Sequence, residues 1–149
     1  MRTFTAAGAS FLLAVLWFDL MFDVQVARKK TGLLEGELAS VSAYYKRVTS
    51  DARPMNRLVA AVMLATVASA VTAVVRHRDP GWVAWSSLAL VVCAVFLAGV
   101  RTVPHAVRLG SGRDPSTEQT ALARSILRDH LMCLTAITAV LVIQLTWAR

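Results

Sequence analysis

The chain has 149 residues, of which 56% are hydrophobic and 17% charged, and its mean hydropathy is +0.57. This composition excludes an ordinary soluble domain and predicts an integral membrane protein. The formal net charge of +7 comes from cations beside apolar segments, where they set topology and contact anionic lipid. We therefore expect membrane lipids as partners and no nucleic acid. The length suits a single domain over residues 1–149.

Four apolar segments are long enough to cross a bilayer, at ~1.5 Å per residue against a hydrocarbon core of ~30 Å. They cover residues 4–26, 58–75, 81–100 and 131–147. The third should end at Arg101, because Pro104 disfavours continuation of a helix. The fourth should extend a helix that begins near Ser116, where Ser116 and Gln119 match a capping box. The predicted fold is all-α, a bundle of four transmembrane helices.

Between the first two spans, apolar residues recur at helical spacing. They are Leu34, Leu38, Val41, Tyr45 and Val48. The opposite side is polar, so residues 33–51 are predicted to form an amphipathic helix that lies on the membrane or over the mouth of the bundle. It would act either as a lid or as a simple tether. Asn56 is the expected N-cap of the second span.

The second span carries small residues at four-residue spacing, which let helices approach closely in lipid. They are Ala61, Ala65, Ser69 and Ala73. We expect this face to contact another helix, either within the chain or in a protein partner or a second copy.

The basic residues are distributed unevenly between the two ends of the spans. Residues 27–57 carry seven Lys and Arg and residues 101–130 carry five, whereas the opposite side carries only Arg2, Arg76, Arg78 and Arg149. The positive-inside rule then predicts a multi-pass protein of the cell membrane, with both termini outside and both long connections in the cytoplasm.

Polar residues from every span gather at the predicted cytoplasmic end. They are Asp19, Asp23, Gln25, Asn56, Arg101, His105, Arg128, Asp129 and His130. Asp19 and Asp23 are four residues apart and share one helix face. Asp23 lies close enough to the interface to be hydrated, whereas Asp19 needs a cavity or a partner. Because a carboxylate in hydrocarbon is costly, Asp19 is either paired with an arginine such as Arg101 or is a functional acid or base.

One hypothesis is an enzyme in which a carboxylate and a histidine at a shared cavity abstract and return a proton on a lipophilic phenol or enol. The candidate catalytic residues are Asp19, Asp23, His105 and His130 for proton transfer, and Arg101 and Arg128 for a developing oxyanion. The candidate substrate-binding residues are Gln25, Tyr44, Tyr45, Asn56 and Asp129. Tyr44 and Tyr45 would either close over an aromatic ligand or anchor their helix at the interface.

Two other classes of function remain open. A non-catalytic membrane subunit or partner-binding bundle would use the small-residue face of the second span. A haem-binding anchor would use His105 and His130 as axial ligands between helices. No metal is expected, because no metal-ligand spacing is present, and Cys93 and Cys133 do not form the C-x-x-C pair of a thiol–disulfide enzyme.

The layout resembles the DUF1772 family of small four-helix membrane proteins, which includes anthrone-oxygenase-like proteins. The resemblance rests on the apolar first helix, the entry to the second span near Asn56, RTVPHAVRL at 101–109, and LARSILRDHLMCL at 122–134. It covers nearly the whole chain. It differs at His105, where many relatives have asparagine. The resemblance implies a membrane-embedded protein, a cofactor-independent oxygenase or isomerase that acts on a hydrophobic aromatic substrate without a recognised metal or flavin.

Overall fold

The computed structural model describes residues 2–27, 33–77 and 79–147. Within these ranges the chain is helical, and four of its helical segments are long and apolar enough to cross a membrane. The elements in chain order are α1 (Arg2–Ala27), α2 (Glu35–Lys46), η1 (Arg47–Asp51), α3 (Arg53–Val75), α4 (Gly81–Leu97), η2 (Ala98–Thr102), α5 (Val103–Ser111) and α6 (Ser116–Thr146). The predicted four-helix membrane bundle is confirmed.

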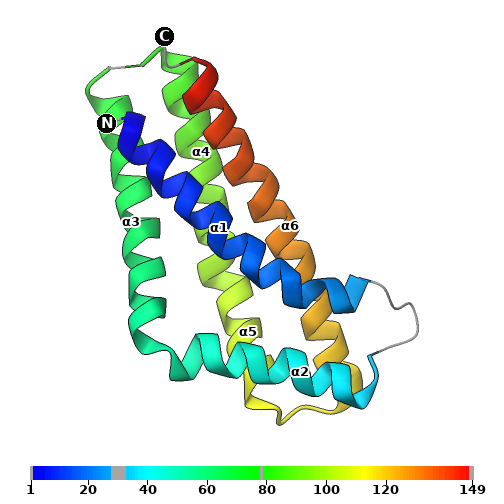
Figure 1. Cartoon of the computed structure of the whole chain (residues 1–149). Helices are drawn as coiled ribbons and strands as arrows, with labels where there is room; N and C mark the ends of the chain where they lie inside the picture. Colours follow the sequence, from blue (N-terminus) through cyan, green and yellow to red (C-terminus); the bar gives the residue numbers. More distant parts are fainter. Residues whose placement is uncertain (1, 28–32, 78, 148–149) are drawn as a thin grey trace.

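The four spans pack side by side, and α2 lies across one end of them (Figure 1). The start of α1, the end of α6 and the turn between α3 and α4 lie together at the opposite end. Helix α1 runs obliquely over the bundle, and it contacts both α6 and α3. This arrangement leaves α1 and α3 side by side near the chain termini and separates them toward α2.

The third span differs from its predicted boundary, because the helix continues past Arg101 to Ser111. The turn Ala98–Thr102 is a π-helix, in which the Val103 amide donates to the Ala98 carbonyl. Pro104 then falls in the first turn of α5, where a missing amide is tolerated. A wide turn before the proline thus lets the chain stay helical, so the expected end at Arg101 is wrong.

The starts of two other spans also differ from prediction. Helix α3 begins at Arg53, with Pro54 in its first turn, so Asn56 lies inside the helix and is not its N-cap. The Asn56 side chain instead donates to the Thr49 carbonyl at 2.9 Å. Helix α6 begins at Ser116 as expected, but no capping box forms there. The Gln119 side chain donates to the Asp114 carbonyl at 2.6 Å.

The predicted amphipathic helix is confirmed, and it packs on the end of the bundle. Leu38, Val41 and Tyr45 are buried, whereas Leu34 is 63% exposed because it precedes the helix. Helix α2 contacts α5 most extensively, and Ser42 donates to the Leu109 carbonyl at 2.9 Å. A hydrophobic cluster of α1, α2, α5 and α6 residues forms this end of the core.

A second hydrophobic cluster joins the transmembrane parts of α1, α4 and α6. Polar contacts also connect helices at this level. Thr5 and Ser69 hydroxyls lie 2.9 Å apart, and Gln144 donates to Ser87 at 3.0 Å. Such pairs are used between helices in lipid, where neither partner finds water. Ser69 and Ala73 of the predicted contact face are buried against the bundle, but Ala61 and Ala65 are exposed.

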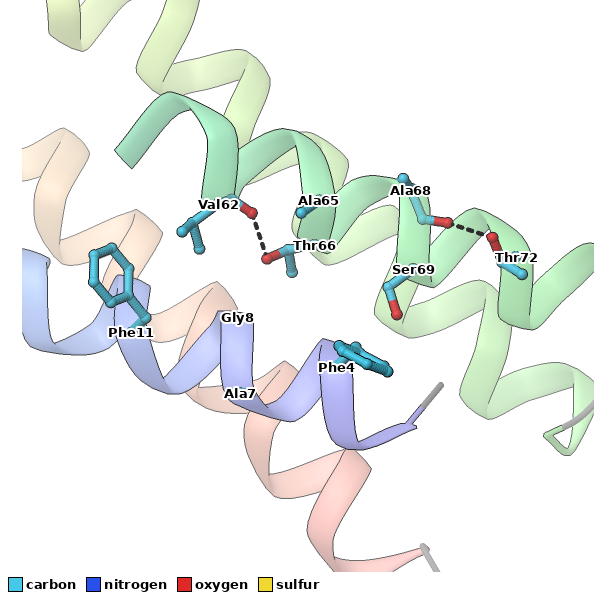
Figure 2. Close-up of a pocket in the computed structure, with 10 residues that line it drawn as sticks. All are labelled: Phe4, Ala7, Gly8, Phe11, Val62, Ala65, Thr66, Ala68, Ser69 and Thr72. Carbon is cyan, nitrogen blue, oxygen red and sulfur yellow. Dashed lines mark hydrogen bonds between the residues drawn. The ribbon is translucent and has the colours of Figure 1, made fainter. Parts of the chain in front are cut away.

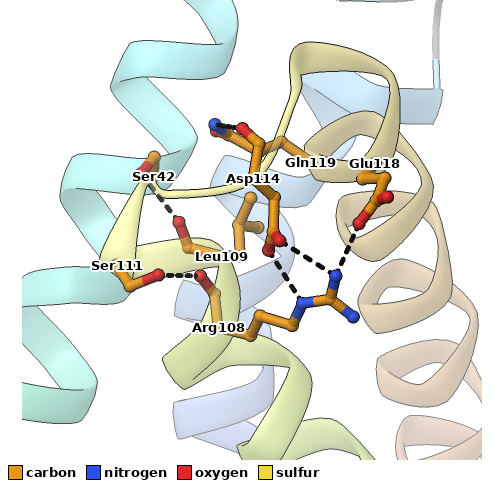
Figure 3. A network of polar contacts seen from close by, with 7 residues as sticks. All are labelled: Ser42, Arg108, Leu109, Ser111, Asp114, Glu118 and Gln119. Carbon is orange, nitrogen blue, oxygen red and sulfur yellow. Dashed lines mark hydrogen bonds and ion pairs between the residues drawn. The ribbon is translucent and has the colours of Figure 1, made fainter.

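The short turn between α5 and α6 is held by one arginine (Figure 3). The Arg108 guanidinium donates to both carboxylate oxygens of Asp114, at 2.8 and 2.9 Å, and to Glu118 at 2.5 Å. Gly112 supports the turn with a φ of 62°, which a glycine adopts without strain. The hydrogen bonds from Arg108 hold the pKa of the Asp114 carboxyl below its usual range.

The contribution of this turn to stability should be lost only in strong acid. Because the pKa of Asp114 is lowered on folding, its contribution is complete above the ordinary aspartate pKa and disappears as pH falls through the lowered value. We expect amide exchange of residues 113–119, corrected for intrinsic rates, to be unchanged between about pH 7 and pH 5. Arg108→Gln should accelerate it already at neutral pH. Equal protection in the variant would contradict this role.

Candidate functional site

The centre of the polar cluster is Asp23 of α1, whose side chain is fully buried. Its Oδ1 accepts a hydrogen bond from the Tyr45 hydroxyl at 2.6 Å. Its Oδ2 lies 2.6 Å from Nδ1 of His130. One carboxylate therefore connects α1 to α2 and to α6.

Asp19 repeats this arrangement one helical turn earlier. Its Oδ1 accepts from the Tyr44 hydroxyl at 2.5 Å, and its Oδ2 lies 3.8 Å from Nε2 of His130. The Tyr44 ring stacks on Phe22, with centroids 3.8 Å apart. The imidazole thus lies between two carboxylates that α1 presents on consecutive turns, which is the consequence of their four-residue spacing.

The two tyrosines act as hydrogen-bond donors in this cluster. Burial and the neighbouring carboxylates raise the pKa of both Tyr44 and Tyr45 well above the usual range. Both phenols therefore stay protonated, as donation to a carboxylate requires. Adjacent residues on α2 reach the two acids because the helix crosses the end of α1 and presents both rings to it.

Of the expectations for the two acids, that for Asp19 is met, because it has Tyr44 and His130 as partners. Asp23, by contrast, was expected to be hydrated, yet its side chain is fully buried. The reason is that α2 covers the end of α1, so proximity to the end of a span does not bring access to water. The pairing of Asp19 with Arg101 is also not found.

Arg101 pairs instead with Asp129, the residue before His130. Its Nε lies 3.3 Å from Asp129 Oδ2, and its Nη2 donates to the Ser125 hydroxyl at 3.0 Å. The Asp129 side chain is 1% exposed. Among the described residues it forms this ion pair, but neither of its carboxylate oxygens accepts a hydrogen bond of good geometry. Ser125 was not among the predicted site residues, although it lies one helical turn before Asp129 on the same face of α6.

The other predicted site residues lie around the cluster or apart from it. Asn56 lines a neighbouring cavity. His105 is half-buried, and its Nδ1 has no hydrogen-bond partner within the described ranges. Gln25 is half-buried on α1, and Arg128 is exposed on α6. Neither belongs to the group formed by Asp19, Asp23, Tyr44, Tyr45 and His130, which we call the carboxylate cluster.

The cavity beside the carboxylate cluster has a volume of about 560 Å³. Residues of α1, α2, η1, α3, η2, α5 and α6 line it, including Asp19, Tyr44, Thr49, Asn56 and His130. A smaller cavity of about 140 Å³ shares Asp19 and His130 with it and extends between the spans. We call the larger one the polar pocket.

A groove also lies between α1 and α3 nearer the chain termini (Figure 2). Its volume is about 610 Å³. Phe4 and Phe11 flank Gly8 along α1, and α3 contributes mostly small residues. The lining residues are Phe4, Ala7, Gly8, Phe11, Val62, Ala65, Thr66, Ala68, Ser69 and Thr72. We call this the α1–α3 groove.

A protein-family model whose description is ER membrane protein SH3 matches residues 3–148. The chain belongs to the SHR3 chaperone family. Because the match covers almost the whole chain, the family accounts for all four spans and for α2. No curated protein and no solved structure matches the chain.

Membership of the SHR3 chaperone family corrects the sequence-based interpretation in three respects. The resemblance to DUF1772 is wrong, because a different family matches. The oxygenase or isomerase function that followed from it is wrong for the same reason, and a non-catalytic, partner-binding bundle agrees better with a chaperone family. The chain is a multi-pass membrane protein, but the family description names the ER membrane where we had expected the cell membrane.

Proposed function

We propose that the protein is a non-catalytic membrane chaperone that shelters transmembrane helices of other membrane proteins before those proteins are assembled. The observation that carries the proposal is the match of residues 3–148 to the SHR3 chaperone family. It acts in the membrane into which its clients are inserted, the ER membrane by the family description. The excess of basic residues beside α2 and α5 favours an orientation with that end in the cytoplasm. Of those counted, Arg28, Lys29, Lys30, Arg78 and Arg149 lie outside the described residues.

The α1–α3 groove is the surface that we assign to a client helix. Ala7, Ala65 and Ala68 are exposed in it, and they lie at membrane level in spans α1 and α3. Small side chains allow the backbone of another helix to approach closely, and van der Waals packing then drives association in lipid. A groove flanked by Phe4 and Phe11 offers more contact area than the convex surface of a single span.

Internal packing explains why the groove stays open. Gly8 lies so close to Thr66 that an added Cβ would collide with the threonine side chain. This contact fixes α1 on α3, while the hydroxyl of Thr66 donates to the Val62 carbonyl at 2.7 Å. The helices therefore meet through small residues at the floor of the groove, and the larger rings flank it.

Filling the groove should abolish chaperone action without unfolding the protein. Ala65→Leu places an apolar side chain in the groove at an exposed position of α3, so stability in the membrane should be unchanged. Ala89→Leu is the matched control, since Ala89 is exposed on another span, α4, and lines neither the groove nor the polar pocket. The measurement is the aggregated fraction of a multi-span transporter synthesised in vitro into vesicles that contain the full chain.

We expect the wild-type chain and Ala89→Leu to lower transporter aggregation severalfold relative to empty vesicles, and Ala65→Leu to lose most of this effect. No effect of the wild-type chain would contradict the chaperone function. Full activity of Ala65→Leu would contradict the assignment of the groove and leave the chaperone function standing.

A further inference from the structure

The polar pocket is lined by an acidic group in span α1. Its lining includes Asp19 and His130, and Asp23 lies directly behind the imidazole. When both carboxylates are ionised, two acids against one imidazole leave a net negative charge that a cation can neutralise. Arg101 does not compensate it, because it pairs with Asp129.

Asp19 is the acid that faces the pocket. Its side chain is 19% exposed, whereas Asp23 is 0% exposed. Tyr44 donates to its Oδ1, but the nearest His130 nitrogen is 3.8 Å from its Oδ2, which is beyond hydrogen-bond distance. This oxygen therefore keeps acceptor capacity toward the cavity, together with the neighbouring polar side chains of Thr49 and Asn56.

The pocket and the α1–α3 groove follow one seam between the same two helices. On α1, the groove is lined by Phe4, Gly8 and Phe11, and the pocket continues this face with Val15 and Phe18. On α3, the groove ends at Val62 and the pocket continues with Val59 and Asn56. A helix that lies in the groove and extends toward α2 must therefore pass the mouth of the pocket.

Transmembrane helices of multi-span proteins carry occasional Lys or Arg residues, which are costly in hydrocarbon until their partners are in place. We propose that the polar pocket binds such a cationic side chain of a client helix, with Asp19 as its counter-ion. This inference rests on the chaperone function proposed above. Asp19 follows Gly8 by 11 positions, so the cation should lie ~16 Å along the client helix from its contact with Gly8.

The test uses the full chain in phosphatidylcholine vesicles and synthetic single-span peptides of leucine and alanine. Three peptides differ at one position about 11 residues from a central small-residue stripe, where they carry Lys, Leu or Glu. Binding is measured by energy transfer between a labelled peptide and the labelled chain. We expect the Lys peptide to bind at least tenfold more tightly than the Leu peptide, and the Glu peptide to bind most weakly.

Asp19→Asn should remove the preference for Lys, while Tyr44→Phe, which removes the hydrogen bond but leaves the carboxylate, should keep it. A second test needs no variant of the protein. Moving the Lys by two residues along the peptide turns it to the opposite face, and this should abolish the preference in the wild-type chain. The two tests remain informative together even where Asp19→Asn lowers the yield of folded protein.

Equal binding of the Lys and Leu peptides by the wild-type chain would overturn the inference and leave the chaperone function intact. A preference for Lys that survives Asp19→Asn in folded protein would overturn the role of Asp19. Failure of the chain to bind any of the peptides or to lower transporter aggregation would instead contradict the proposed function itself.

Discussion

Replacing Asp23 with alanine should lower the free energy of unfolding by about 3 to 5 kcal/mol, the range for breaking a buried ion pair from one side. The Asp23 carboxylate is fully buried, and it is the acceptor for Tyr45 and the partner of His130 at 2.6 Å. Without it, a phenol and an imidazole nitrogen remain buried with no acceptor. The measurement is reversible unfolding of the purified protein in mixed detergent micelles.

Three further variants distinguish the network from a general effect of removing an acid. Tyr45→Phe keeps the ring but removes one donor, and it should cost about 1 to 3 kcal/mol. In the double variant with Asp23→Ala the two effects should not add, because both remove the same hydrogen bond. Asp51→Ala, at an exposed acid of η1, should change stability by less than about 0.5 kcal/mol. If Asp23→Ala costs no more than this control, the cluster does not hold the bundle together.

Gly110→Ala should destabilise the protein by about 3 kcal/mol, at the upper end of the usual range for overpacking. An added Cβ would lie 2.6 Å from the Lys46 amide nitrogen and 2.9 Å from the Tyr45 carbonyl carbon. These are backbone atoms of α2, so the helix itself must move away from α5. Because Tyr45 moves with it, the hydrogen bond to Asp23 should weaken as well.

Gly36→Ala is the matched control for this prediction. Gly36 lies in the first turn of α2, and an added Cβ would meet nothing within 4 Å. Alanine is the better helix former, so this variant should be neutral or stabilised by up to about 1 kcal/mol. Hydrogen exchange of α2 amides reports the displacement directly. Unchanged protection of α2 in Gly110→Ala would show that the two helices are not held in close contact.

The fold was largely predictable because its signals are local. Each span is a continuous apolar segment, and the stripe that ends at Val48 follows the period of a helix, so neither requires knowledge of a distant partner. The boundaries were less predictable. Pro104 indicates the end of a helix by its own chemistry, yet the π-turn before it keeps the helix continuous to Ser111. Nothing in the local sequence distinguishes these outcomes.

The arrangement of the cluster was predictable only in part. The sequence indicates which end of the bundle holds the polar residues and that Asp19 needs a partner. Distance along α1 misjudged Asp23, because burial there depends on how α2 folds back. The tyrosines beside the predicted stripe were interpreted as ligand-binding or anchoring groups, and the structure shows them donating to Asp19 and Asp23. The signal available in the sequence was the match between two neighbouring tyrosines on one helix and two acids on one face of another.

The enzyme interpretation failed for a related physical reason. A carboxylate, an imidazole and a phenol near a cavity are the groups that catalysis uses, but the same groups also satisfy one another when helices meet in lipid. The resemblance to DUF1772 was based on helix layout, which many small membrane bundles share. Only the family match over residues 3–148 separates these cases.

The long separation between Asp23 and His130 has a consequence for biosynthesis. The two residues are 107 positions apart in the chain, so α1 leaves the ribosome well before its imidazole partner is translated. Of the partners that the structure shows for the acids of this helix, the tyrosines of α2 are the ones translated early. The first span therefore completes its contacts only after α6 has been inserted, and this protein itself passes through the exposed state from which we propose that it protects others.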